Sequence, residues 1–164
     1  MLKDVLAPNL KIVFCGTAAG AVSAARNEYY AGPGNKFWAV IHEVGLTHRR
    51  MLPSEYKDLL KYRIGLTDVV KGQAGSDADI DFRRSELAAL TQKIEKLSPG
   101  VIAFNGKKAA QVFLGKRQVK YGHQHEQVGT TRLFVAPSTS GAANGFWNVD
   151  LWKELAELVL KVTT

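Results

Sequence analysis

One short segment sets the fold class: Ile12-Val13-Phe14-Cys15-Gly16-Thr17-Ala18-Ala19-Gly20, where an apolar run ends in small residues. An apolar run of this length, bounded by glycine, is typical of a buried strand. The small residues leave backbone N–H groups uncovered at its carboxyl end, which is where open α/β sheets bind ligands. The aromatic pair Tyr29-Tyr30 and the segment Gly34-Asn35-Lys36-Phe37-Trp38 follow. We therefore expect a site for a flat, polar ring.

Outward from this segment, short apolar runs alternate with stretches of helical periodicity, a pattern that favours an α/β fold with a mostly parallel sheet. We expect strands at 10–15, 101–104 and 132–136, and a strand or turn at 64–70. Helices are expected at 35–44, 53–62, 83–97, 106–113 and about 149–162, with an exposed loop at 72–81. Together these elements predict a three-layer α/β/α domain that spans residues 1–164.

Composition is that of a globular protein, because 46% of the 164 residues are hydrophobic. The chain has no apolar run of about 18 residues, so no membrane span is expected, and its first residues lack an apolar signal region. A disulfide framework is excluded because Cys15 is the single cysteine, and we expect it to be buried in the first strand. These features predict a cytoplasmic protein.

The chain is basic, with a net charge of +7 and a pI near 9.6. A cationic surface attracts polyanions, so nucleic acid is the favoured partner. A basic surface without a specific partner is the alternative, because charge alone does not identify a ligand. Clusters of basic residues occur at 48–50, 57–63, 107–108 and 116–120.

Motifs for nucleotides and metals are incomplete. The glycines of Gly16-x-x-x-Gly20 lack both the Gly-Lys-Ser/Thr ending of a phosphate loop and the third glycine of a dinucleotide fingerprint. The pair His123 and His125 has no cysteine or carboxylate pattern that completes a metal site. We therefore expect no metal and no cofactor.

Several segments, in the same order along the chain, resemble the mismatch-specific uracil/thymine-DNA glycosylases of the uracil-DNA glycosylase superfamily. They are Leu6-Ala7-Pro8, Val13-Phe14-Cys15-Gly16, Pro33 to Trp38, Leu59 to Thr67, Gly106-Lys107, and Val135 to Gly141. The resemblance implies the three-layer fold of that superfamily and hydrolysis of the bond between a base and its deoxyribose. The base must first leave the stack, because its glycosidic carbon cannot be reached inside a duplex.

The resemblance also implies which residues bind the base. Tyr30 matches an aromatic residue that stacks on the flipped base, and Thr17, Ala18 and Gly20 lie in the segment whose backbone N–H groups bind the base. For Tyr30, the alternative is a half-buried tyrosine with a structural role only.

A second set of residues matches the segments that hold DNA. It comprises Ser138, Thr139, Ser140, Gly141, Ala142 and Lys107. An ordinary Ser/Gly turn is the alternative for 138–141. Phe146 lies near the small residues Ala142 and Ala143, which occupy the usual position of the wedge that enters the DNA, and it is either a substitute wedge or part of the core.

The match fails at the catalytic residue. The family asparagine that positions water is replaced by Ala18, and the leading asparagine of the second segment by Ser138. Asn35 resembles the asparagine of the hypoxanthine-DNA glycosylase branch, although capping a helix is an equal alternative. Asp68 is the other candidate, because a carboxylate activates water or stabilises a cationic sugar. Its alternative is an aspartate at the surface or in a turn.

The sequence thus predicts a monomeric, monofunctional DNA glycosylase that excises uracil, or hypoxanthine or another deaminated base, from double-stranded DNA. Two alternatives remain open. One is a damaged-DNA-binding protein of the same fold with weak or no catalysis, and the other is a binder of small nucleobases or nucleotides.

Overall fold

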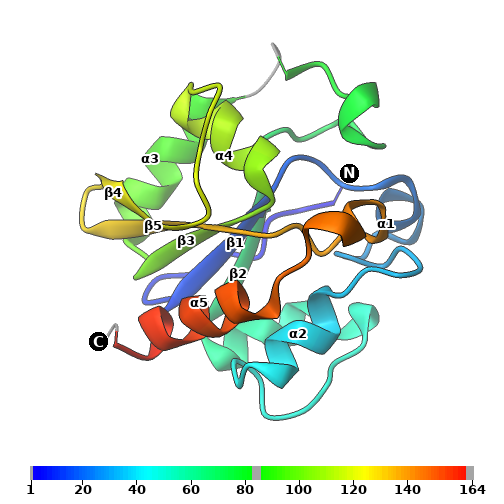
Figure 1. The fold of residues 1–164 in the computed structure, drawn as a ribbon, viewed down its shortest axis with the longest axis horizontal. Coiled ribbons are helices and arrows are strands. Elements are labelled where there is room, and N and C mark those ends of the chain that lie inside the picture. Colours follow the sequence, from blue (N-terminus) through cyan, green and yellow to red (C-terminus); the bar gives the residue numbers. More distant parts are fainter. Residues whose placement is uncertain (1, 83–85, 162–164) are drawn as a thin grey trace.

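The computed structural model describes residues 2–82 and 86–161, and its centre is a five-stranded sheet in the order β2-β1-β3-β5-β4 (Figure 1). The strands are β1 Ile12–Gly16, β2 Ile64–Asp68, β3 Val101–Asn105, β4 Gly122–Val128 and β5 Thr131–Ala136. The pairs β1–β2, β1–β3 and β3–β5 are parallel, whereas the edge strand β4 is antiparallel to β5. The predicted mostly parallel sheet is confirmed.

Helices cover both faces of this sheet. They are α1 Ala21–Arg26, α2 Phe37–Glu43, α3 Leu87–Leu97, α4 Lys107–Leu114 and α5 Val149–Lys161, with 3-10 segments η1 Pro53–Tyr62, η2 Asp77–Asp79 and η4 Gly141–Phe146. In Figure 1, α3 and α4 lie on one side of the sheet, and α2 and α5 lie on the other. The structure therefore has the predicted α/β/α layers.

The alternation of side chains along β1 explains the two layers. Phe14 points into a core that includes Phe37 of α2 and Trp152 of α5. Val13 and Cys15 point into the other core, together with residues of α3 and α4. Successive side chains of a strand point to opposite faces, and burying a large apolar side chain stabilises the fold by about 1.5–3 kcal/mol. Cys15 is 1% exposed, so its expected burial is confirmed.

The topology creates a crevice between β1 and β3. After β1 the chain continues to α2 on one face, whereas after β3 it continues to α4 on the opposite face. Gly16 pairs in register with Asp68, and Asn105 pairs with Ala136, so the parallel strands end at the same level. Ligands of open α/β sheets bind at such a switch point.

The predicted strands and helices are present, with ends that differ by a few residues. Residues 83–85 of the helix expected at 83–97 lie outside the described residues, and so do residues 162–164 at the chain end. The segment 53–62 is a 3-10 rather than an α-helix. Strand β4 was not expected, because its sequence Gly-His-Gln-His-Glu-Gln-Val is polar; an edge strand with partly exposed side chains tolerates this. No helix in the described part of the chain has the length and hydrophobicity needed to cross a membrane.

Candidate functional site

A cleft of about 620 Å³ lies at the carboxyl ends of the parallel strands. Its walls are the segments that follow β1, β3 and β5, and Asp68, the last residue of β2, contributes to its lining. Every predicted site residue lines it: Thr17, Ala18, Gly20, Tyr30, Asn35, Asp68, Lys107, Ser138, Thr139, Ser140, Gly141 and Ala142. The fold thus gathers residues that are widely separated in the sequence.

The cleft wall that follows β1, residues 16–20, is fixed in place by hydrogen bonds to its backbone carbonyl groups. The carbonyls of Gly16, Thr17 and Ala19 accept hydrogen bonds of 2.9 Å from the N–H groups of residues 69, 70 and 75. The N–H groups of Ala18 and Gly20 form no hydrogen bond with the described residues. This segment therefore offers free backbone donors to a ligand while its own position is fixed.

Tyr30 forms part of the floor and has a backbone φ of 52°, in the left-handed region. Its ring stacks on Phe37, with centroids 4.2 Å apart and an interplanar angle of 25°. Only the other face of the ring is left for a ligand. Its hydroxyl is buried without a hydrogen-bond partner among the described residues. Burial and the nearby charge of Asp68 raise the pKa of Tyr30 well above its usual range, so the hydroxyl keeps its proton.

Asn35 binds the first N–H of helix α2 and also lines the cleft. Its Oδ1 accepts a hydrogen bond of 3.0 Å from the N–H of Phe37, the first residue of α2. This bond identifies the side-chain oxygen, so the amide nitrogen is the group left free among the described contacts. Asn35 therefore offers a hydrogen-bond donor to the cleft, which suits a carbonyl oxygen of a base.

Asp68 is the buried acid of the cleft. The residue is 7% exposed, so the alternative of a surface aspartate is wrong. Its Oδ2 lies 3.1 Å from Nζ of Lys71, while Oδ1 lies 2.8 Å from the position that a Cβ on Gly16 would occupy. Burial raises the pKa of Asp68, and the charge of Lys71 acts in the opposite direction. Glycine at position 16 is what allows this close approach.

Asn105 is a cleft residue that the sequence reasoning missed. It ends β3, donates from Nδ2 to Oγ1 of Thr139 (2.9 Å), and accepts at Oδ1 from the Thr139 N–H (2.9 Å). Thr139 is 1% exposed, so it shapes the cleft from inside and offers no surface to DNA. A polar residue directly after the apolar run 101–104 was the available signal, because strand ends of this kind face the crevice.

The wall after β5 carries the remaining polar groups. The Oγ of Ser138 accepts from the N–H of Ser140, and the Oγ of Ser140 accepts from the N–H of Ala142, at the start of η4. Gly141 lies against Gly34: a Cβ at Gly141 would be 3.4 Å from the Gly34 carbonyl oxygen. The Ser/Gly turn is thus real, and it also lines the cleft.

Basic and apolar side chains lie on the segments that line the cleft or directly follow its lining residues. Lys107 begins α4, and its ammonium lies 4.4 Å from the ring centroid of Tyr121. Lys36 bonds to Asn144 and lies 5.4 Å from the ring centroid of Trp147. Phe146 of η4 is 71% exposed, so the alternative that places it in the core is wrong.

Among residues 2–82 and 86–161, no cluster of three or more His, Cys, Asp or Glu residues is placed to hold a metal ion.

Comparison with known proteins agrees with this geometry. Residues 3–156 match a family model described as the uracil DNA glycosylase superfamily. A solution NMR structure from Methanosarcina acetivorans, described as a "putative Uracil DNA glycosylase", is similar over 97% of this chain and 96% of its own, with a TM-score of 0.65 and 25% sequence identity. The family match runs from the N-terminal segment into α5 and includes every wall of the cleft.

Proposed function

The chain belongs to the uracil DNA glycosylase superfamily, and we propose that it is a monofunctional DNA glycosylase that releases uracil from duplex DNA. Hypoxanthine and other deaminated bases are further candidate substrates. The enzyme acts as a monomer in this proposal and needs no metal or cofactor. The observation that carries it is the buried carboxylate of Asp68, which lines the cleft and has one oxygen without a hydrogen bond to the described residues. Ala18 stands where the mismatch-specific enzymes that the chain resembles carry an asparagine.

Asp68 supplies the general base in this proposal. A water oxygen bonds to C1′ of the deoxyribose, the C1′–N bond breaks, and its electron pair passes to the base. Asp68 takes the proton that the water loses, and the raised pKa of this carboxyl strengthens it as a base. The base leaves as an anion and then takes a proton from solvent.

The free donors of the cleft stabilise the departing base. In this proposal, the N–H groups of Ala18 and Gly20 and the amide nitrogen of Asn35, which have no partner among the described residues, donate hydrogen bonds to its carbonyl oxygens. Fixed donors stabilise the charge that develops in the transition state without reorganising. The exposed face of Tyr30 stacks on the base, because its other face is covered by Phe37.

Hydrolysis without strand cleavage is supported by the state of Lys71, the lysine beside Asp68. Burial acts to lower the pKa of Lys71, but the charges of Asp68 and Asp4 outweigh burial and raise it, so Lys71 stays an ammonium and has no free electron pair to attack C1′. Lys71 also does not line the cleft. The DNA backbone is held by Ser140, Ala142 and Lys107 at the rim.

Base release from labelled oligonucleotides tests the proposal. The substrates contain uracil, thymine opposite guanine, hypoxanthine or xanthine, single-stranded and duplex, and alkali reveals abasic sites. We expect release of uracil by the wild type and a loss of about 10²–10⁴-fold in Asp68→Asn. Asp58→Asn is the matched control, because Asp58 is half-buried on η1, does not line the cleft, and forms an ion pair only with Lys61 among the described residues.

Ala18 favours one second function, the binding of damaged DNA without catalysis, because alanine has no side-chain group to position water. In that case lesion DNA binds tightly, but no base is released even with enzyme in excess. This result would overturn the glycosylase proposal.

A further inference from the structure

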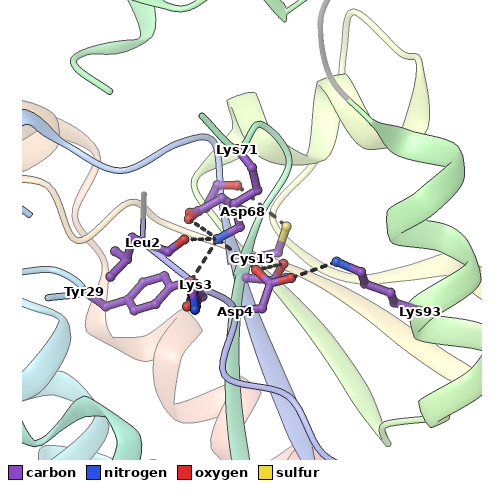
Figure 2. A network of polar contacts seen from close by, with 10 residues as sticks. Leu2, Lys3, Asp4, Cys15, Tyr29, Asp68, Lys71 and Lys93 are labelled. Atoms are coloured by element: carbon purple, nitrogen blue, oxygen red, sulfur yellow. Dashed lines mark hydrogen bonds and ion pairs between the residues drawn. The ribbon is translucent and has the colours of Figure 1, made fainter. Parts of the chain in front are cut away.

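Four charged side chains, those of Asp4, Asp68, Lys71 and Lys93, form one network (Figure 2). Nζ of Lys71 lies 3.1 Å from Oδ2 of Asp68 and 2.8 Å from Oδ1 of Asp4. Nζ of Lys93, on α3, lies 3.2 Å from the other oxygen of Asp4. The network connects the N-terminal segment and α3 to the end of β2, where Asp68 enters the cleft.

The Lys71 ammonium is held from several sides. Besides both carboxylates, it donates to the hydroxyl of Tyr29 at 2.9 Å and to the carbonyl of Leu2 at 3.3 Å. Its side chain is 23% exposed, and that of Asp68 is 5% exposed. A pair at this depth is screened far less than a surface ion pair, which contributes little. Lys71 therefore has a fixed position relative to Asp68.

The two carboxylate oxygens of Asp68 have different contacts. Oδ2 accepts from Lys71, whereas Oδ1 approaches Gly16 and forms no hydrogen bond with the described residues. Lys71 thus fixes the rotation of the carboxylate and leaves one oxygen for the cleft. Lys71 itself does not line the cleft; it lines a neighbouring cavity of about 240 Å³, which it shares with Asp68.

Titratable groups face Asp68 from every side. They are Lys71 after β2, Asp4 of the N-terminal segment, Cys15 of β1, and Tyr29 and Tyr30 before α2. Burial raises the pKa of Cys15 and of both tyrosines, so these groups stay uncharged. Burial and Asp4 raise the pKa of Asp68, and Lys71 is the one cation among the described residues that contacts it.

We propose that Lys71 is a positioning residue that holds Asp68 as an oriented carboxylate at the floor of the cleft without touching the substrate, an inference that rests on the proposed glycosylase function. The Lys71–Asp68 pair differs from a purely structural ion pair because it affects the pH dependence of base release. Lys71 and Asp4 act on Asp68, and Asp68 sets the pH at which base release is lost in acid.

Substitution of the lysine gives the first test. In Lys71→Met, Asp68 loses its cation while Asp4 remains, so the acid limb of single-turnover uracil release moves up by about 1–3 pH units. Lys71→Arg keeps the charge and restores most of the wild-type profile. An unchanged acid limb in folded Lys71→Met, checked by near-UV circular dichroism, overturns the proposal.

Asp4→Asn provides a test of opposite sign. Removing this negative charge lowers the pKa of Asp68, so the acid limb moves to lower pH. General destabilisation does not produce shifts in opposite directions for the two variants. Lys93→Met is the matched control, because Lys93 contacts Asp4 and not Asp68, and we expect its profile to stay close to wild type. Shifts of the same sign in Lys71→Met and Asp4→Asn also refute the proposal.

Carbon-detected NMR of the Asp68 carboxyl separates this inference from the proposed function. The resonance titrates at higher pH in Lys71→Met than in wild type, whether or not base is released. If wild type releases no base but this shift is present, the glycosylase function fails and the control of Asp68 by Lys71 stands. If base is released but the resonance titrates at the same pH in both proteins, the inference fails and the function stands.

Discussion

The ring of Tyr30 lies on the ring of Phe37, with centroids 4.2 Å apart, and the Tyr30 hydroxyl is buried without a partner among the described residues. Phe37 begins α2, and its N–H is bound by Asn35, so the stack is attached to the start of a helix. This arrangement gives the floor of the cleft a rigid aromatic surface. The ring of Tyr30 therefore has a stacking partner while its hydroxyl has no hydrogen-bond partner, so the contributions of ring and hydroxyl can be tested separately.

Tyr30→Phe removes the hydroxyl and keeps the stack. Burying an unpaired hydroxyl costs about 1–3 kcal/mol, so we expect this variant to be at least as stable as wild type in urea unfolding. Tyr30→Ala removes the stacking surface and weakens binding of lesion DNA by about 1–3 kcal/mol. If Tyr30→Phe loses as much affinity as Tyr30→Ala, the hydroxyl rather than the ring contacts the base.

Gly16→Ala places a methyl group 2.8 Å from Oδ1 of Asp68 and 3.4 Å from the Tyr30 hydroxyl. The carboxylate must move, so we expect a large loss of base release and destabilisation of about 1–3 kcal/mol. Gly145→Ala is the matched control, because Gly145 does not line the cleft and a Cβ there meets nothing within 4 Å. Single-turnover release and urea unfolding measure both variants, and full activity in Gly16→Ala would show that Asp68 need not hold this position.

Phe146→Ala tests the exposed side chain beside the cleft. A residue that is 71% exposed contributes little to stability, so the free energy of unfolding should change by less than about 0.5 kcal/mol. If Phe146 fills the gap left by the flipped base, release from duplex DNA falls while release from single strands is unchanged. Leu160→Ala, 69% exposed on α5, is the control and should affect neither substrate. Equal losses on single and double strands would contradict the wedge role.

Glu55 gives a prediction for acid stability. Its pKa is lowered from 4.5 to about 2 by the bidentate bond to Arg49 and by the Leu52 N–H. A lowered folded-state pKa means that the stabilisation is complete above 4.5 and is lost as the pH falls towards 2. The stability difference between wild type and Glu55→Gln, measured by urea unfolding, should therefore shrink across that window. A constant difference would show that the carboxylate charge does not stabilise the fold.

Local pattern predicted three of the four parallel strands outright and left 64–70, which contains β2, as a strand or turn. Apolar runs that end in small or polar residues mark β1, β2, β3 and β5, and parallel strands place all such ends at one edge. This rule brings Gly16 and Ser138 together without knowledge of any contact, whereas Asp68 was singled out for the chemistry of its carboxylate. The edge strand β4 could not be predicted in this way, because a partly exposed strand has no continuous apolar run.

The sequence by itself determined the fold class, because periodicity and strand ends are local properties of the chain. The resemblance to known glycosylases, which is also a property of the sequence, indicated a set of residues that line the cleft, although it did not include Asn105. Only the tertiary structure decided what those residues do for one another. Lys71 meets Asp4 and Asp68, Asn105 meets Thr139, and Tyr30 stacks on Phe37. Two of these contacts, Lys71 with Asp4 and Asn105 with Thr139, join segments far apart in the sequence. Burial makes such charges and hydrogen bonds strong, so the chemistry of the site depends on packing that no local pattern records.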